Sequence, residues 1–443
     1  MKKLFVLLLI IAVTLGSLSG CSNQSVEEPS NEESIITENV YDALNTDQLK
    51  DLLSESGTIL IDTRSTYAFN GWKMDIEERG GHIEGAVSFE ASWLDVLESD
   101  EAVQAELDRF GITKDKHVAT YGYGQESAKK VADKLITLGY ENVYFYEDGF
   151  ETWANKSDYP LVSMAHYENL VHPEWVKENA EGIKLFEVSW GPDGVEAYIP
   201  NAVHINTDDF EVGPLWNRRS DEEIEASILS YGVASDSRVV LYGADITAAA
   251  RIALIMKYAG VEDVRLLDGG TQSWTDAGFE MTNEGAAKVA IDTFGVDVPQ
   301  HPEYIDDMPQ AKEVLSNDAG RLVSIRSWVE YIGETSGYDY IEAAGRIPGA
   351  VYGYAGSDPW HMEDYRNVDN TMVNYEYMAN RWADQDILPE HDNAFYCGTG
   401  WRAAETWFYA YSMDWDNVSV YDGGWKEWSE TEGNPIEKGE PKK

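Results

Sequence analysis

Cysteine is almost absent from this chain of 443 residues, in which only Cys21 and Cys397 occur. Two cysteines exclude the disulfide framework on which many exported domains depend. Basic residues are also scarce, since 33 Lys and Arg stand against 80 Asp and Glu and give a formal net charge of −47. This balance argues against nucleic-acid binding and against a polybasic membrane patch. An anionic substrate would therefore have to be held by a local positive site.

A long hydrophobic run is missing as well. The apolar stretch from Leu4 to Gly16 is shorter than the about 20 residues that a membrane span needs. Together with the basic start of the chain and the small residues before Cys21, it predicts a cleaved secretory signal over residues 1–20. Cleavage would remove Lys2 and Lys3 and change the net charge from −47 to −49.

The segment Leu18-Ser19-Gly20-Cys21 resembles the bacterial lipobox, whose cysteine becomes the acylated first residue of the mature protein. Residues 21–40 are rich in Ser, Asn and Glu, a composition typical of a disordered tether. We therefore expect lipidation at Cys21 and anchoring at the extracytoplasmic face of the cell membrane. The alternative is an ordinary signal peptide with Cys21 lost or free.

One pattern occurs three times in the remaining chain. Each copy opens with a short apolar strand: GTILIDTRS, GIKLFEVSW and GRLVSIRSW. A small-residue turn follows in GGHIEGAVSF, EAYIPNAVHI and AGRIPGAVYG. A second strand then runs into a loop and an Ala-rich helix: HVATYGYGQESAKK, RVVLYGADITAAAR and AFYCGTGWRAAE. A third strand ends in an aromatic turn: VYFYEDGFETW, VRLLDGGTQSW and VSVYDGGWKEW.

Strands that alternate with helices predict a parallel α/β sheet in each copy. We expect three tandem domains: domain 1 over residues 41–163, domain 2 over 164–285 and domain 3 over 300–437. Domain 3 also carries an insert at about residues 354–389 that is rich in Trp, Tyr and Asn. An insert of this length is either a lid or binding loop, or decoration without a role at the site.

The second cysteine lies in the loop of domain 3, within FYCGTGWRAAE. Gly398 and Gly400 allow backbone torsions that other residues resist, and a helix begins just after them. A strand, a glycine-rich turn and a helix N-terminus aim several backbone N–H groups at one spot, which suits an anion. Such surroundings, with Arg402 nearby, favour the nucleophilic thiolate. The loop thus predicts a reactive Cys397; the alternative is a small, buried and inert residue.

Taken together, these motifs resemble rhodanese domains, the sulfurtransferase family. The shared residues are the DTR-type strand end, the GHIEGA and GRIPGA turns, the CGTGWRA loop and the DGGW turn. The resemblance implies three rhodanese-like domains, each with a parallel sheet flanked by helices. It also implies a cysteine persulfide held in the loop after the fourth strand, with no metal and no organic cofactor.

Within the resemblance, Cys397 matches the family nucleophile, and Arg402 matches the loop-closing position that is often basic. Arg326 matches the arginine of the D-x-R strand end, as a substrate contact or as part of a structural ion pair. Ser324 stands where that motif usually has Asp. The loop that cradles the persulfide through its amides matches four residues: Gly398, Thr399, Gly400 and Trp401.

Domains 1 and 2 depart from the family at the nucleophile. Our alignment of the copies puts Tyr121 and Tyr242 at the position of the cysteine, and Glu126 and Thr247 at that of the loop-closing arginine. The spacing to the aspartate of the aromatic turn is then 27, 26 and 25 residues in domains 1, 2 and 3. A phenol keeps its proton at neutral pH and cannot replace a thiolate. We therefore expect both domains to be inactive in sulfur transfer and to shape the cleft or bind a protein partner.

The sequence thus predicts a sulfurtransferase. The Cys397 thiolate would take the outer sulfur of thiosulfate or a similar small anion, and cyanide or a thiol would then accept it. Two alternatives stay open. One is an extracytoplasmic binding or scaffold protein built from the three copies. The other is a Cys-based phosphatase with a C-x5-R loop, although only four residues separate Cys397 from Arg402.

Overall fold

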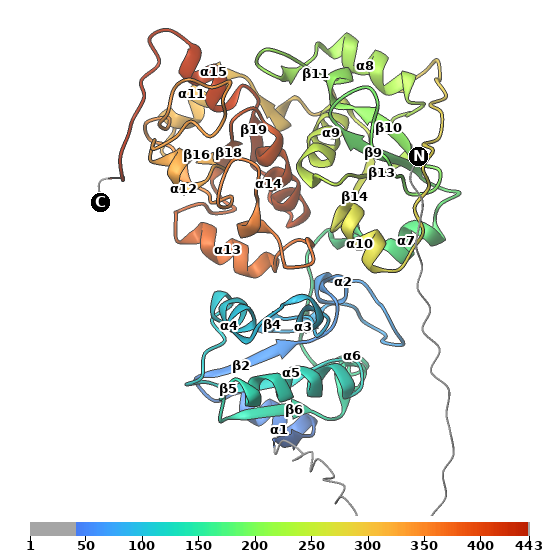
Figure 1. Ribbon diagram of the computed structural model, residues 1–443, viewed down its shortest axis with the longest axis vertical. Coiled ribbons are helices and arrows are strands. Elements are labelled where there is room, and N and C mark those ends of the chain that lie inside the picture. The colour runs from blue at the N-terminus through green and yellow to red at the C-terminus, as the bar shows by residue number, and fades with distance from the viewer. Residues whose placement is uncertain (1–40, 442–443) are drawn as a thin grey trace, which may run out of the picture. The chain divides into compact units, whose positions relative to one another are not determined.

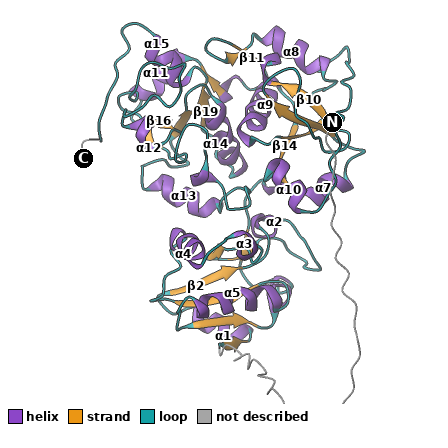
Figure 2. Cartoon of the chain, viewed as in Figure 1, coloured by secondary structure: helices purple, strands orange, loops and turns teal. Residues whose placement is uncertain are grey.

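The computed structural model describes residues 41–441, and three five-stranded sheets form the centres of three α/β domains (Figure 1). The paired strands within each of these sheets run parallel, and helices pack around them (Figure 2). The predicted fold class is therefore confirmed. The predicted signal, the tether and Cys21 lie outside the described residues. Within residues 41–441, no helix combines the length and the apolar character that a membrane crossing needs.

Domain 1 carries an antiparallel strand pair beside its parallel sheet. The sheet strands are β1 (Asp42–Leu44), β2 (Thr58–Asp62), β4 (Ala86–Ser88), β5 (His117–Tyr121) and β6 (Val143–Tyr146), and the pair is β3 (His82–Ile83) with β7 (Leu161–Val162). The helices are α1 (Thr46–Leu53), α2 (Thr66–Asn70), α3 (Trp93–Val96), α4 (Asp100–Arg109), α5 (Glu126–Thr137) and α6 (Gly149–Ala154). The order across the sheet is β4–β2–β5–β6–β1.

Domain 2 repeats this arrangement and adds a short antiparallel hairpin. The sheet strands are β8 (Leu170–Val171), β9 (Lys184–Ser189), β10 (Val203–Asn206), β13 (Arg238–Tyr242) and β14 (Asp263–Leu267), and the hairpin is β11 (Glu211–Val212) with β12 (Asn217–Arg218). The helices are α7 (Pro173–Glu178), α8 (Asp221–Ser230), α9 (Ile246–Ala259) and α10 (Gly270–Asp276). The order across the sheet is β10–β9–β13–β14–β8.

Domain 3 has the same sheet order, β17–β16–β18–β19–β15. Its strands are β15 (Ile305–Asp306), β16 (Gly320–Ser324), β17 (Val351–Tyr352), β18 (Asp392–Tyr396) and β19 (Val418–Tyr421). Its helices are α11 (Met308–Ser316), α12 (Trp328–Tyr331), α13 (Tyr375–Ala383), α14 (Trp401–Ser412) and α15 (Gly424–Glu430). The middle strands of the three sheets, β5, β13 and β18, are buried along all but their first residue.

Helices α9 and α14 pack against each other and join domains 2 and 3 (Figure 1). Every residue of α9 is buried, and so is almost all of α14. A helix that is buried all round needs cover on every side, and here the sheet of its own domain and the other helix share that task. Because each helix starts directly after the loop of its own sheet, this packing brings both loops to the boundary between the domains.

Candidate active site

Cys397 lies in the turn between strand β18 and helix α14, as the sequence predicts. The strand ends at Tyr396, and the helix begins at Trp401. Between them, Gly400 has a φ of +105°, a left-handed conformation that favours glycine. The first N–H groups of a helix have no partner inside the helix. This end of α14 therefore favours negative charge beside the cysteine.

The turn is held so that a backbone amide reaches the thiol. The Gly400 N–H donates to the Cys397 Sγ over 3.2 Å. The carbonyl oxygens of Cys397 and Gly398 accept hydrogen bonds from Trp425 N–H (2.8 Å) and Lys426 N–H (3.1 Å) in helix α15. Cys397 itself is buried, with 1% of its surface exposed. The amide contact is a feature that a cysteine acting only as core filling does not need.

Arg402 makes a bidentate ion pair with Glu330 beneath the turn. Its Nη1 and Nη2 each donate to one carboxylate oxygen at 3.0 Å, and both side chains are buried. Burial is the largest single effect on Glu330 and raises its pKa, but the charges and hydrogen bonds of Arg402, Arg326 and Ser327 together outweigh it and lower the pKa to about 2. Glu330 was not among the residues predicted from the sequence. The pattern that could have indicated it is S-x-x-E, because Ser327 and Glu330 form a capping box at the start of helix α12.

Arg326 is fully buried, and each of its side-chain nitrogens donates to a group of the protein. Its Nε donates to Glu330 (3.2 Å), its Nη1 to the Gly345 carbonyl (2.7 Å) and its Nη2 to the Ser336 carbonyl (3.1 Å). All three side-chain nitrogens of Arg326 therefore bind groups of the protein itself. The structural ion pair, the second interpretation left open by the sequence, describes this residue.

Domain 1 explains why Ser324 can stand in place of the usual aspartate. There, Arg64 pairs with Asp62 at 2.6 Å and donates to the Gly81 carbonyl at 2.7 Å. In domain 3 the carboxylate comes from Glu330 in helix α12 instead of from the strand. Arg326 thus corresponds to Arg64, but its carboxylate partner comes from a different element of the domain.

An aromatic rim borders the turn, formed by Trp216 of domain 2 and by Tyr338, Tyr340 and Trp360 of domain 3. Neighbouring ring centroids lie 5.0–5.1 Å apart from Trp216 to Tyr340, from Tyr340 to Tyr338 and from Tyr338 to Trp360. Tyr338 leaves no room for a side chain at Gly398, where a Cβ would lie 2.4 Å from its ring. Burial raises the pKa of Tyr340 to about 12, although Thr399 donates a hydrogen bond that opposes this.

The strand register corrects our alignment of the copies by one residue. Tyr121 pairs with Asp62 across the sheet of domain 1, Tyr242 with Glu187 in domain 2, and Tyr396 with Ser324 in domain 3. The two tyrosines therefore correspond to Tyr396, the residue before the cysteine. The residues at the position of Cys397 are Gly122 and Gly243, and those at the position of Arg402 are Ser127 and Ala248, not Glu126 and Thr247.

Hydrogen bonds at the aromatic turn confirm this register. Phe150, Thr271 and Trp425 donate their N–H groups to the carbonyls of Gly122, Gly243 and Cys397. With this register the spacing from the loop to the glycine before each donor is 27 residues in all three domains: Gly122–Gly149, Gly243–Gly270 and Cys397–Gly424. With the corrected register the spacings to Asp148, Asp268 and Asp422 become 26, 25 and 25 residues, and the remaining difference arises because Asp148 directly precedes its glycine. The expectation that domains 1 and 2 lack the nucleophile stays, because glycine has no side chain.

The insert of domain 3 packs between the domains. The Met372 N–H donates to the Asp268 carboxylate of domain 2 at 2.8 Å, and Trp93 Nε1 of domain 1 donates to Asp369 at 2.7 Å. This part of the insert is therefore neither a lid over the cysteine nor loose decoration. Trp360 and Pro359 of the insert instead contact Tyr338 in the aromatic rim beside the turn.

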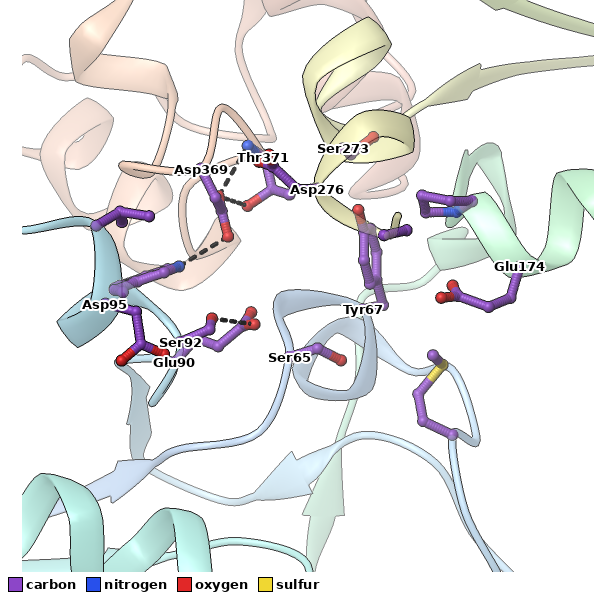
Figure 3. Close-up of a pocket in the computed structure, with 15 residues that line it drawn as sticks. Ser65, Tyr67, Glu90, Ser92, Asp95, Glu174, Ser273, Asp276, Asp369 and Thr371 are labelled. Carbon is purple, nitrogen blue, oxygen red and sulfur yellow. Dashed lines mark hydrogen bonds between the residues drawn. The ribbon is translucent and has the colours of Figure 1, made fainter. Parts of the chain in front are cut away.

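A cavity of about 470 Å³ lies where the insert meets domains 1 and 2 (Figure 3). Ser92 Oγ donates to Glu90, and Lys130 pairs with Asp95. Burial, followed by the charge of Asp369, raises the pKa of Glu90 to about 7. Cys397 does not line this cavity, which belongs to the interface of the domains. The acidic residues that line it are Glu90, Asp95, Glu174, Asp276 and Asp369.

The chain belongs to the rhodanese-like domain family, whose model matches residues 45–156, 172–277 and 302–431. It is 41% identical over 403 residues to thiosulfate sulfurtransferase YnjE of Escherichia coli, covering 88% of this chain and 91% of the relative. It is also 32% identical over 294 residues to the sulfur carrier protein TtuD of Thermus thermophilus, covering 63% of this chain and all of the relative.

Solved structures of a second kind of sulfur-transferring protein are equally similar. Wild-type EanB superposes with a TM-score of 0.87 at 38% identity, covering 91% of this chain and 99% of EanB. The anaerobic ergothioneine biosynthesis enzyme from Chlorobium limicola, in complex with its natural substrate trimethyl histidine, gives the same TM-score at 39% identity, covering 91% of this chain and all of the enzyme. In a further EanB structure, ergothioneine is covalently linked with a persulfide cysteine. These relatives support a sulfurtransferase enzyme as the general class of this chain.

Proposed function

We propose that the protein moves sulfane sulfur through a persulfide on Cys397, with thiosulfate or a similar small anion as the donor. The thiolate attacks the outer sulfur, the S–S bond to sulfite breaks, and the bonding electron pair leaves with sulfite. An acceptor nucleophile then takes the outer sulfur and releases the thiolate. The observation that carries the proposal is the Gly400 N–H directed at Sγ in a turn that precedes a helix.

A positive group lies directly behind this turn. Arg402 and Arg326 both pair with Glu330, all three are buried, and two guanidinium groups against one carboxylate leave one positive charge. This is the local positive site that an anionic donor needs in a protein with a net charge of −47. Preorganised charge and amide N–H groups stabilise an anion without reorganising during the reaction.

Two classes of acceptor fit the site. Cyanide or a thiol is the acceptor class that agrees with thiosulfate sulfurtransferase activity. An aromatic cation such as trimethylated histidine is the second, because the aromatic rim offers flat rings beside the turn and EanB-type enzymes act on such a substrate. The aromatic rim would help to bind an aromatic cation, whereas it offers no advantage for the binding of cyanide.

Mass spectrometry of the intact protein tests the first step. Incubation with thiosulfate should add one sulfur atom at Cys397, and Cys397→Ser should show no addition. The loaded protein is then offered cyanide, a thiol or trimethylated histidine, and thiocyanate, a low-molecular-weight persulfide or a thiolated imidazole identifies the acceptor class. No addition from thiosulfate or from polysulfide would overturn the proposal. A phosphatase would instead hydrolyse a phosphate ester, for which we expect no activity.

We also propose that Cys21 is lipidated and holds the protein at the extracytoplasmic face of the cell membrane. The lipobox-like sequence and the polar stretch after it support this. Cys21→Ala should move the protein from the membrane fraction to the soluble fraction or stop its processing, and unchanged fractionation with normal processing would contradict lipidation. Domains 1 and 2, which lack the nucleophile, offer surfaces for a protein partner or a scaffold role; cross-linking of the membrane-bound protein tests this.

A further inference from the structure

Arg251 connects domain 2 with the active turn of domain 3. It lies on helix α9, eight residues after Gly243, and is fully buried. Its Nη2 lies 2.6 Å from the Asp422 carboxylate of domain 3 and donates to the Trp216 carbonyl at 3.1 Å. Its Nε donates to Glu211 of its own domain at 3.2 Å. Three groups therefore fix the guanidinium plane at the domain boundary.

The remaining nitrogen of Arg251 is directed at the turn. Among the described residues, Nη1 has no hydrogen-bond partner. A Cβ placed on Gly400 would lie 3.1 Å from this nitrogen and 3.3 Å from Cζ. The guanidinium thus packs against the backbone of Gly400, the residue whose N–H contacts the Cys397 thiol. A buried, unpaired N–H group carries a large penalty unless something at the site uses it.

Glu211 holds the next residue of the turn. The indole Nε1 of Trp401 donates to both Glu211 carboxylate oxygens, at 2.9 and 3.1 Å. Glu211 opens the β11–β12 hairpin of domain 2, and the other end of that hairpin, Arg218, donates its N–H to Asp422 at 2.8 Å. Domain 2 therefore contacts the turn through Gly400 and Trp401 and contacts the aromatic turn of domain 3 through Asp422.

We propose that domain 2, which has no nucleophile, completes the active site of domain 3 and that Arg251 is the positioning residue. By packing on Gly400 and by pairing with Glu211 and Asp422, Arg251 keeps the Gly400 N–H on the sulfur of Cys397. A small displacement of a positioned group from the reacting atom lowers a rate by much more than its effect on folding suggests. The inference rests on the proposed persulfide chemistry for its functional meaning, but the contact with the thiol can be tested without any donor.

The same interface supplies a matched control. Arg366 pairs with Glu405 at 2.6 Å, and Glu405 stands on helix α14 eight residues after Cys397, the position that corresponds to Arg251 on α9. Both pairs are shielded from solvent, and Arg366 also lies 4.0 Å from Asp245, beside the Gly243 loop of domain 2. Arg366→Met therefore removes a comparable ion pair without touching the active turn.

The experiment measures two rates on the full chain, for wild type, Arg251→Met and Arg366→Met. They are the alkylation of Cys397 by iodoacetamide, followed by peptide mass spectrometry, and its persulfide formation by thiosulfate. We expect Arg251→Met to lower the persulfide rate by about tenfold to a hundredfold and to change the alkylation rate, while Arg366→Met leaves both near wild type. Arg251→Lys should restore thermal stability but only part of the persulfide rate. Equal rates in Arg251→Met and Arg366→Met would overturn the proposal.

Two further outcomes can be distinguished: a wild-type protein that forms no persulfide, and an Arg251→Met variant that does not fold. If wild type forms no persulfide, the proposed function fails, and the alkylation rates alone decide whether Arg251 positions the turn. If Arg251→Met does not fold, Glu211→Gln serves instead, because it weakens the hold on Arg251 and leaves an oxygen for Trp401. We then expect a persulfide rate between wild type and one-tenth of wild type, and a rate equal to wild type would overturn the proposal.

Discussion

The loops at Gly243 and Cys397 occupy the same place in domains 2 and 3, and each is covered by the other domain. Arg251 and the β11–β12 hairpin of domain 2 reach the Cys397 turn. In the opposite direction, the insert of domain 3 reaches the aromatic turn that follows the Gly243 loop, where Met372 N–H donates to Asp268. Both loops are therefore contacted by the neighbouring domain, and such contact does not by itself distinguish the Cys397 turn from the Gly243 loop.

What differs is the chemistry around the loops. Asp422, behind the Cys397 turn, is paired with Arg251 and Arg218. Asp268, its counterpart in domain 2, has no cation paired with it among the described residues, and burial raises its pKa to about 7. The Cys397 turn combines a thiol with cations paired to its aspartate, whereas the Gly243 loop has no thiol and its aspartate, Asp268, has no paired cation among the described residues. The absence of a cysteine from the domain 2 loop thus goes together with a different electrostatic environment.

Removing the nucleophile should have the largest effect and should abolish the difference between the loops. Cys397→Ser is expected to lower thiocyanate formation by about a thousandfold or more, because a serine oxygen cannot carry the persulfide sulfur. Persulfide-dependent thiocyanate formation measures this. Cys21→Ala is the control and should react as wild type does. Sulfur transfer that survives in Cys397→Ser would place the chemistry elsewhere.

Breaking the ion pair beneath the turn should lower stability more than it alters the thiol. Arg402→Met leaves Glu330 with one cation fewer in a buried site, which is expected to lower the free energy of unfolding by about 3–5 kcal/mol. Combining it with Glu330→Gln leaves the buried Arg326 without a carboxylate partner and should lower the free energy of unfolding further. Urea unfolding measures both. A double variant at least as stable as the single one would show that Arg326 does not depend on the Glu330 carboxylate.

Giving domain 2 a cysteine should not make its loop active. In Gly243→Cys the new Cβ would lie 2.6 Å from the Val188 carbonyl, so we expect the free energy of unfolding to fall by about 1–3 kcal/mol. No second persulfide should form. Gly122→Cys is the matched variant in domain 1, where the nearest atom is the movable Oγ of Ser127 at 2.1 Å. A persulfide on either introduced cysteine would show that the loops differ only in the nucleophile.

The raised pKa of Asp268 predicts a pH dependence of stability. In the folded protein the Asp268 carboxyl keeps its proton up to about pH 7, whereas in the unfolded chain the same group loses its proton near pH 4. Folding is therefore favoured at low pH by this group, and the benefit is lost as the pH rises through about 7. Asp268→Asn mimics the protonated form, and it should raise the free energy of unfolding by about 2–3 kcal/mol more at pH 8 than at pH 5. Thermal unfolding at both pH values measures this, and an equal gain at both would exclude the titration of Asp268 as its cause.

The smallest effects are expected at the tyrosines that end the central strands. The hydroxyls of Tyr121 and Tyr242 accept hydrogen bonds from Ile83 N–H (3.1 Å) and Ile199 N–H (2.8 Å). Changing both to Phe should cost about 1 kcal/mol of unfolding free energy each and leave sulfur transfer within about twofold. A large loss of activity would mean that domains 1 and 2 take part in the chemistry by a route other than the contacts at Arg251.

The sequence was enough for the fold and for the place of Cys397 in a turn before a helix. Alternating apolar strands and amphipathic helices are local patterns, so they predicted three parallel sheets. The turn at Cys397 was also readable, because its glycines and the following helix are neighbours of the cysteine in the chain. Features that depend on residues close in sequence are determined by the sequence itself.

Only the tertiary structure decided the partners of these residues. The one-residue correction at Tyr121 and Tyr242 came from hydrogen bonds between strands, which no spacing along one strand reveals. Glu330 takes the role of the aspartate missing at Ser324, although it lies on a helix. Arg251 stands in a helix whose sequence is otherwise that of a buried core element. A buried charge is stable only beside its partners, and these partners, Asp422 above all, are distant in the chain and meet Arg251 because two domains pack together.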